Sequence, residues 1–281
     1  MKLKETIAVG YLRINLRLLS LVSKKCAAKK ALRLFCTPLN KSKKKLSALF
    51  NTAEKLHFYL DKKLVTGYRW NFPRSKKFLV VHGFQSAAKN FEKYIALMIS
   101  KNYEVLAFDA PAHGESEGTR INVLEYSSFI KEICTRYGPI ETFMAHSFGG
   151  LAISLALEDI IHTDKTRLVL IAPATETSTA VDLLFNFLKL KDNLRTDFEN
   201  LIISMGGVTV QWLSVSRAIK NIRARILWIH DEDDDITPLK DVQPLIQSGY
   251  SNIQFMITKG FGHRRIYHEK EVIEAVTTFL T

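Results

Sequence analysis

The feature that most constrains the fold is the alternation of short apolar runs with helical stretches after residue 55. Six apolar runs follow one another along the chain, namely Phe78–Val81, Val105–Phe108, Thr142–Ala145, Leu168–Ile171, Ile226–Ile229 and Ile253–Ile257. Such continuous apolar runs are typical of parallel strands that are buried on both faces. Helices are expected between them, near residues 89–100, 122–137, 148–158, 238–247 and 269–280. The pattern therefore predicts an α/β fold with a mostly parallel central sheet flanked by helices.

Two segments depart from this alternation. Lys55–Leu60 and Leu64–Trp70 predict an antiparallel hairpin that turns at Asp61-Lys62. Residues 176–222 place about 45 residues between two strands, which is too long for an ordinary connection and predicts a helical lid insertion. The expected domains are a basic helical extension over residues 1–50, a core over residues 51–175 and 223–281, and the lid over residues 176–222.

The positive charge of the chain is confined to its first fifty residues. The whole chain has a formal net charge of +12, and residues 1–50 contain thirteen Lys or Arg and a single acid, Glu5. The remaining residues are therefore neutral overall. A basic segment attracts anionic lipid or nucleic acid, but no nucleic-acid-binding motif accompanies it, and no nucleic-acid partner is expected.

Residues 5–23 predict an amphipathic helix with two alternative roles. Apolar residues at steps of three and four share one face, namely Ile7, Tyr11, Ile14, Leu18 and Leu21. The basic residues nearby favour peripheral membrane contact through residues 1–25. A further set of leucines widens the apolar arc, which favours packing on the protein's own body. A second short helix is expected from Cys26 to Cys36, followed by a solvated loop over Lys41–Lys45.

The cysteines and the apolar runs indicate the compartment of the protein and whether a metal is bound. Cys26, Cys36 and Cys134 have no metal-ligand spacing and form no disulfide framework, which favours reduced thiols in a cytoplasmic protein. Arg13 and Arg17 interrupt the N-terminal apolar region, so a secretory signal is not expected. No run approaches the roughly 18 uncharged apolar residues of a transmembrane helix. Neither a metal nor an organic cofactor is predicted.

A serine follows the third apolar run in the segment Ala145-His146-Ser147-Phe148-Gly149. A serine on a sharp turn from strand to helix points outward, and the residues two before and two after it must be small. Ala145 and Gly149 meet this requirement. Ser147 is therefore the candidate nucleophile, and the backbone N–H of Phe148 is a candidate oxyanion donor.

A second donor is expected after an earlier strand, where the chain reads His82-Gly83-Phe84. Acyl transfer needs two N–H groups directed at the oxyanion of the tetrahedral intermediate. The backbone N–H of Phe84 is the candidate for the second one. The alternative is that His82-Gly83 only turns the chain, but its position two strands before the serine favours the oxyanion role.

The acid is expected in the run of five acidic residues that follows Ile226–Ile229. An acid after this strand can reach a histidine on the next loop and hold its tautomer. Thr237-Pro238 predicts a helix start, and the triad order favours Asp234. Asp233 and Asp235 remain alternatives. Asp231 and Glu232 are interpreted as parts of a solvated turn.

The base is expected in the segment Gly260-Phe261-Gly262-His263, directly after the last strand. His263 and His268 are the only histidines after the acidic run. A base must come within hydrogen-bond reach of the serine, which suits a glycine-flanked loop better than the start of the final helix. His263 is therefore the candidate base, and His57, His113, His146 and His162 are assigned no catalytic role.

Residues 65–281 resemble the serine esterase/lipase-like branch of the α/β-hydrolase superfamily. The resemblance rests on four motifs in order: His82-Gly83-Phe84, the loop Asp109–Ser116, the turn Ala145–Gly149, and the pair Asp234 and His263. In similar proteins the loop Asp109–Ser116 shapes the floor of the site and is seldom catalytic. Ala145 and Asp231 both stand where similar sequences usually carry glycine, and the second departure weakens the register that selects Asp234.

The motifs together predict a serine hydrolase that cleaves an ester or thioester of a small, hydrophobic substrate through an acyl-enzyme. The apolar residues of segment 176–222 favour the hydrophobic substrate. An acyltransferase or a C–C bond hydrolase would use the same triad. A catalytically silent binding protein on the same fold is the alternative from another class. The sequence does not specify the oligomeric state.

Overall fold

The computed structural model describes residues 3–39 and 46–281, and the chain divides into two compact units. The smaller unit comprises residues 1–37 and 176–214, and the larger comprises residues 38–175 and 215–281. The loop expected at Lys41–Lys45 lies outside the described residues. The N-terminal helices thus belong to the same unit as most of the segment between the fourth and fifth parallel strands.

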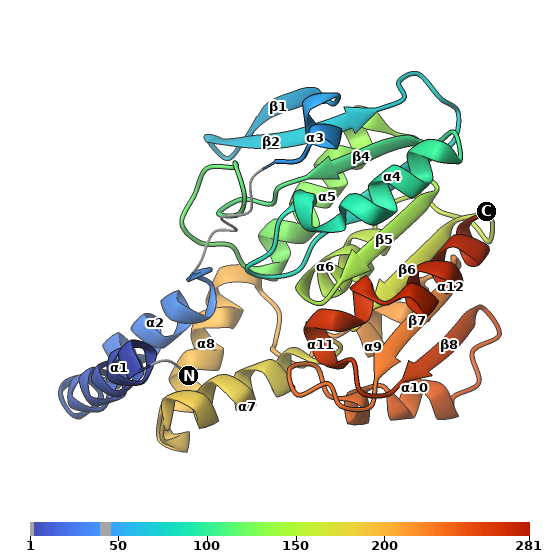
Figure 1. The fold of residues 1–281 in the computed structure, drawn as a ribbon. Coiled ribbons are helices and arrows are strands. Elements are labelled where there is room, and N and C mark those ends of the chain that lie inside the picture. The colour runs from blue at the N-terminus through green and yellow to red at the C-terminus, as the bar shows by residue number, and fades with distance from the viewer. Residues whose placement is uncertain (1–2, 40–45) are drawn as a thin grey trace. The chain divides into compact units, whose positions relative to one another are not determined.

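The larger unit is built on an eight-stranded sheet (Figure 1). Its strands are β1 (Glu54–Leu60), β2 (Lys63–Trp70), β3 (Lys77–Val81), β4 (Glu104–Phe108), β5 (Thr142–His146), β6 (Arg167–Ile171), β7 (Arg225–Asp231) and β8 (Ile253–Thr258). The order across the sheet is β1-β2-β4-β3-β5-β6-β7-β8. The strand β2 pairs antiparallel with β1 and β4, and the other neighbours are parallel. The predicted α/β architecture is confirmed.

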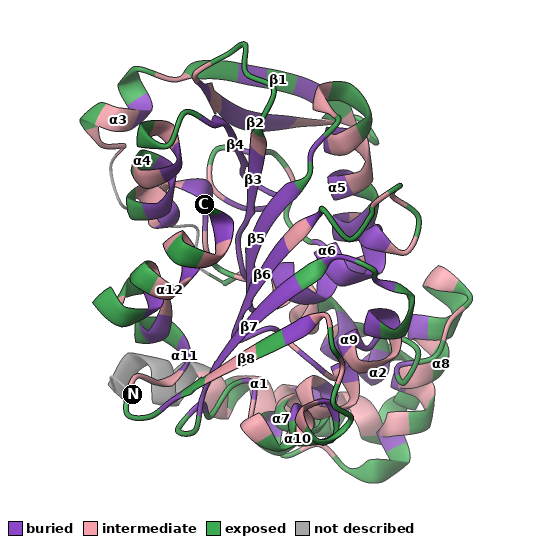
Figure 2. Cartoon of the chain, turned by 90° about the vertical axis from the view of Figure 1, so that its right-hand side faces the viewer, coloured by how far each residue is buried: buried purple, intermediate pink, exposed green. Residues whose placement is uncertain are grey.

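Helices cover both faces of this sheet, with α4 and α12 on one face and α5 and α6 on the other (Figure 2). The helices of the larger unit are α3 (Ala48–Asn51), α4 (Glu92–Ser100), α5 (Val123–Tyr137), α6 (Phe148–Leu157), α9 (Val215–Ala218), α10 (Gln243–Gln247), α11 (Gly262–Arg265) and α12 (Lys270–Leu280). The start of α5 is fixed by a capping box, in which Asn122 and Glu125 each bond the other's backbone N–H.

The predicted hairpin is present and turns at the predicted residues. Leu60 pairs with Lys63, so the loop between β1 and β2 contains only Asp61 and Lys62. Both have positive φ angles, 45° and 65°, as a two-residue turn that matches the twist of the strands requires.

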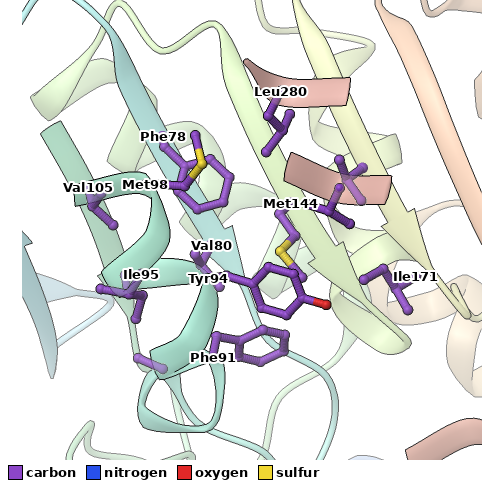
Figure 3. Close-up of a cluster of buried hydrophobic side chains, with 14 of the residues drawn as sticks. Phe78, Val80, Phe91, Tyr94, Ile95, Met98, Val105, Met144, Ile171 and Leu280 are labelled. Atoms are coloured by element: carbon purple, nitrogen blue, oxygen red, sulfur yellow. The ribbon is translucent and has the colours of Figure 1, made fainter. Parts of the chain in front are cut away.

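The core between the sheet and α4 fixes the strands that carry the site (Figure 3). Phe78, Val80 and Met144 from β3 and β5 are each at most 2% exposed. Tyr94 and Met98 of α4 pack against them in the same cluster. Burying each such side chain stabilises the fold by roughly 1.5–3 kcal/mol. The packed core therefore holds the carboxyl ends of β3 and β5 in place.

The smaller unit is helical. Its helices are α1 (Leu3–Val22), α2 (Lys24–Phe35), α7 (Thr177–Leu188) and α8 (Arg195–Gly206). The ring of Phe198 meets Phe35 and Phe185 edge to face, at centroid distances of 5.9 and 5.4 Å. Because Ser23 caps α2 through the N–H of Cys26, this helix starts before the predicted position. The role of segment 176–222 as a lid stays a prediction. In the described parts of the chain, no helix is long and apolar enough to cross a membrane.

Candidate active site

Ser147 lies on a strained turn between the end of β5 and the start of α6. Its φ of 53° and ψ of −124° are unfavourable for a residue with a side chain. The turn is held by backbone hydrogen bonds on both sides. The N–H of Ser147 donates to the carbonyl of Ile171, and its carbonyl accepts from the N–H groups of Gly150 and Ala174. The strand–turn–helix context that the motif requires is thus present.

The small residue after the serine is required by a close backbone approach. A Cβ atom on Gly149 would lie 2.5 Å from the carbonyl oxygen of His82 and 2.8 Å from that of Val81. Both are backbone atoms and cannot move aside cheaply. The end of β3 therefore presses against the start of α6, and only glycine permits this contact.

The structure brings Ser147, His263 and Asp234 together in a hydrogen-bonded chain. The Oγ of Ser147 lies 2.9 Å from Nε2 of His263, and Nδ1 of His263 lies 2.8 Å from Oδ2 of Asp234. All three side chains are buried. Because a carboxylate only accepts, Nδ1 of His263 donates to Asp234 and Nε2 is left to accept the hydroxyl hydrogen of Ser147.

The other two candidate acids point elsewhere. The Oδ2 of Asp233 accepts a hydrogen bond from the N–H of Gly260 at 3.0 Å, and Asp235 is exposed. Asp234 is 4% exposed. Of the three acids left open by the sequence, Asp234 is the one that lies against His263.

Asp234 is held as a carboxylate by its hydrogen-bond donors. Burial by itself raises the pKa of this carboxyl, but the bond and charge of His263 and the N–H groups of Thr237 and Ile236 outweigh burial and hold the pKa below its usual value. The hydroxyl of Thr237 also donates to Oδ2 of Asp234 at 2.8 Å. The ring of His230, whose pKa burial lowers, contacts the carbonyl of Thr237 through Nε2.

Two expectations about this loop are wrong. Thr237 does not start a helix, because its side chain is bonded to Asp234 and the next short helical turn begins at Leu239 behind Pro238. Asp231 is not part of a solvated turn, since it is fully buried at the end of β7.

Asp231 instead links the loop after β7, which carries Asp234, to the loop after β8, which carries His263. Its carboxylate accepts hydrogen bonds from the N–H groups of Phe261 and Gly262 and from the hydroxyl of Thr258, at 2.7–3.1 Å. Burial raises the pKa of Asp231, but these bonds and one from the N–H of Asp233 outweigh it and lower the pKa overall. The residue directly before His263 is thus bonded to Asp231.

The candidate oxyanion loop lies directly against the serine. A Cβ on Gly83 would be 3.0 Å from Cβ of Ser147 and 3.0 Å from Nδ1 of His146. This places the residue before Phe84 in contact with the nucleophile turn. Phe148 begins α6, where the first N–H groups have no partner within the helix. The rings of Phe84 and Phe148 meet edge to face with centroids 5.5 Å apart.

Two buried histidines, His82 and His113, hold this loop. His82 contacts the carbonyl of Gly83 through Nδ1 at 2.8 Å and accepts from the N–H of Ala110 through Nε2 at 2.9 Å. Burial lowers the pKa of His82 to about 4, so the ring is neutral at pH 7. His113 contacts the carbonyl of Pro111 through Nδ1 and accepts from the N–H of Gln85 through Nε2. Each ring therefore carries its hydrogen on Nδ1 and fixes backbone on either side of Phe84.

A third histidine, His146, lies against His263. Its Nε2–H donates to the carbonyl of His263 at 3.1 Å, and the two ring centroids are 4.8 Å apart. Burial lowers the pKa of His146 to about 3. The neutral ring of His146 therefore packs against His263 and holds its backbone carbonyl. Within residues 3–39 and 46–281, no cluster of three or more His, Cys, Asp or Glu could hold a metal ion.

The fold and the motifs define the class of this protein. The sheet order, the strand–turn–helix position of Ser147 and the loops after β7 and β8 are those of the α/β-hydrolase fold. The family model described as serine aminopeptidase, S33, matches residues 73–199. This range includes Ser147 but ends before Asp234 and His263.

The proteins to which the chain is similar include putative esterases or lipases and an uncharacterized hydrolase. The chain is 27% identical over 135 residues to "Putative esterase/lipase 2" of Mycoplasma genitalium. The aligned residues make up 45% of this chain and 50% of that protein. The chain spans half or less of the length of the curated relatives it matches. Among solved structures, an esterase of Pyrococcus furiosus matches with a TM-score of 0.64 at 18% identity, over 87% of this chain and 97% of the other. A thioesterase domain from the curacin biosynthetic pathway matches with a TM-score of 0.57 at 14% identity, over 82% of this chain and all of the other.

Proposed function

We propose that this chain is a serine hydrolase that cleaves small, hydrophobic carboxylic esters or thioesters. The observation that carries the proposal is the continuous hydrogen-bonded chain from Ser147 Oγ through His263 to Asp234. A buried serine needs an adjacent base to become a nucleophile, and a base needs a partner that fixes its tautomer.

The proposed reaction has two steps. Nε2 of His263 takes the proton of Ser147 as Oγ attacks the acyl carbon, and the same proton then passes to the departing alcohol or thiol as its bond to the acyl carbon breaks. Water then attacks the acyl-enzyme, giving its proton to His263, and the acid leaves as Ser147 is restored. The N–H groups of Phe84 and Phe148 stabilise the oxyanion in both steps.

The preference for a hydrophobic acyl group rests on the two rings beside the nucleophile. The side chains of Phe84 and Phe148 are only partly buried. The backbone N–H groups of the same two residues are the proposed donors to the carbonyl oxygen of the substrate. An acyl chain bound there would contact aromatic surface. We therefore expect butyrate and hexanoate esters to be hydrolysed faster than succinate monoesters, and the reverse order would contradict this part of the proposal.

The test is labelling of the purified full chain with a fluorophosphonate probe, which reacts with an activated serine. Wild type should be labelled, and Ser147→Ala and His263→Ala should not. Ser248→Ala and His268→Ala are matched controls, since they remove an exposed serine and the other histidine after the acidic run. Labelling that persists in Ser147→Ala, or is absent from wild type, would overturn the proposal and favour a silent binding protein.

A further inference from the structure

The first helix of the smaller unit uses only part of its apolar surface to pack within the protein. Leu16 of α1 is fully buried, and Leu12 and Leu19 on the same side are partly buried. The face formed by the apolar residues at steps of three and four is exposed. Its residues are Tyr11, Ile14, Leu18 and Leu21, which are 69%, 60%, 59% and 80% exposed and form the α1 stripe.

The α1 stripe is a continuous surface rather than a set of scattered side chains. Its residues are separated by three, four and three positions, so they lie one above another along one side of a 20-residue helix. Val22, which is 87% exposed, adjoins its end. Single exposed leucines are common on proteins, but a row of large apolar side chains indicates a binding surface.

The charges beside the α1 stripe are basic. Arg17 lies next to Leu21 and Ile14 around the helix and is exposed, and Lys24 and Lys25 are exposed where the chain continues into α2. No ion pair found in the described parts of the chain involves these three side chains. Glu5 is the only acid among the first fifty residues.

We propose that the α1 stripe docks on an anionic membrane surface, with α1 lying in the plane of the headgroups. An apolar face with basic residues at its border is the pattern of helices that bind such surfaces, because the side chains enter the acyl boundary while the cations meet lipid phosphates and carboxylates. Arg13 of α1 donates a hydrogen bond to the carbonyl of Phe187 in α7. This bond does not involve the side chains of the α1 stripe, which stay exposed.

The two other occupants fit less well. A second copy of the chain docking stripe to stripe would join two surfaces that are both bordered by Arg17, Lys24 and Lys25, and their like charges would oppose the contact. Nucleic acid would engage the cations but would leave the apolar side chains of the stripe in water.

The experiment is co-sedimentation of the full chain with vesicles of phosphatidylcholine alone or mixed with phosphatidylserine. Wild type should bind the mixed vesicles at least about tenfold more tightly than the neutral ones, and less tightly as salt is raised. Leu18→Gln with Leu21→Gln should weaken binding about tenfold or more, because both side chains leave the acyl boundary. Arg17→Gln with Lys24→Gln and Lys25→Gln should abolish the preference for phosphatidylserine.

Matched controls separate the stripe from general effects. Ile161→Gln removes an apolar side chain that is 97% exposed in the larger unit, and Lys62→Gln with Lys101→Gln and Lys240→Gln removes three exposed charges there. Both should bind like wild type. Circular dichroism and the unfolding midpoint of every variant should match wild type, which separates loss of docking from loss of fold.

Three results would overturn the proposal. The first is equal binding to neutral and anionic vesicles, and the second is binding that the Leu18 and Leu21 substitutions leave unchanged. The third is a dimer, measured by light scattering without lipid, that these two substitutions convert to monomer, since that would assign the stripe to a second copy of the chain.

Discussion

The nucleophile turn at residues 145–149 and the acid loop at residues 231–237 both follow strands of the same sheet, but different forces fix them. The turn is set by contacts between neighbouring backbones, where Gly149 meets the end of β3 with no space for a side chain. The acid loop is set by hydrogen bonds to residues about thirty positions away, such as Gly262 and His263. Steric requirements of this kind leave a local mark in the sequence, whereas bonds between loops do not.

The largest effect that tests this comparison is expected at Asp234. Asp234→Asn keeps the shape of the side chain but removes the charge that holds the tautomer of His263, and kcat should fall roughly 10³–10⁴-fold. Asp233→Asn, whose side chain bonds the backbone of Gly260, is the matched control and should stay within about threefold of wild type. Steady-state hydrolysis of a butyrate ester measures both, and a larger loss in Asp233→Asn would reassign the acid.

The next effect concerns the sterically fixed turn. Gly149→Ala would put a Cβ against the carbonyl oxygens of Val81 and His82, so we expect a loss of about 1–3 kcal/mol in the free energy of unfolding and a fall in kcat as Ser147 shifts. Gly10→Ala is the matched control, because its Cβ would meet nothing within 4 Å in α1 and should stabilise the helix by about 0.5–1 kcal/mol. Urea denaturation measures both, and equal effects would show that the turn is not sterically fixed.

A smaller effect is expected at Asp231, which joins the acid loop to the loop after β8 that carries His263. Asp231→Asn weakens the bonds to Phe261 and Gly262, so kcat should fall about tenfold and the free energy of unfolding by about 1–2 kcal/mol. Glu232→Gln removes the neighbouring exposed charge, which pairs with Lys259 at the surface, and should change stability by less than about 0.5 kcal/mol.

The same variant gives a pH prediction. The folded-state pKa of Asp231 is depressed, so its contribution to stability is fully present above the unfolded carboxyl pKa of about 4 and is lost as the pH falls through the lower folded value. The stability difference between wild type and Asp231→Asn should therefore be constant from neutral pH down to about 5 and shrink below about 4. A difference that grows on acidification would mean that the carboxyl is protonated when folded.

The smallest effect is expected at Thr237. Thr237→Val removes the hydroxyl that donates to Asp234 but keeps the shape of the side chain, and kcat should fall about three- to tenfold. Thr135→Val, on the exposed side of α5, should have no measurable effect on kcat. An unchanged rate in Thr237→Val would show that the other donors alone orient Asp234.

The comparison also explains which parts of the structure the sequence could predict. The strands, the hairpin at Asp61-Lys62 and the position of Ser147 depend on local periodicity, turn geometry and small residues, which are visible in a short window. The roles of Asp231 and Thr237 depend on the approach of the loops after β7 and β8. A run of five acids gives no sign that its first member is buried, and Thr237-Pro238 has the composition of a helix start.

The supporting role of three histidine rings was not predicted, for a related reason. His82, His113 and His146 act as neutral rings that bond to backbone, and their function depends on burial rather than on spacing. The signal that could have found them is position, because each stands at the carboxyl end of a strand or in the loop after one, next to a glycine or serine of a recognised motif.

The two proposed oxyanion donors have a consequence for how this protein can change over evolutionary time. Both are main-chain groups, so substitution of Phe84 or Phe148 by other non-proline residues alters the neighbouring ring and leaves the N–H in place. Mutation can thus reshape the space around the acyl group while the charge-stabilising part of the site is inherited intact. The Phe84–Phe148 pair, with rings in edge-to-face contact, is therefore where substrate preference can diverge at the least cost to the chemistry.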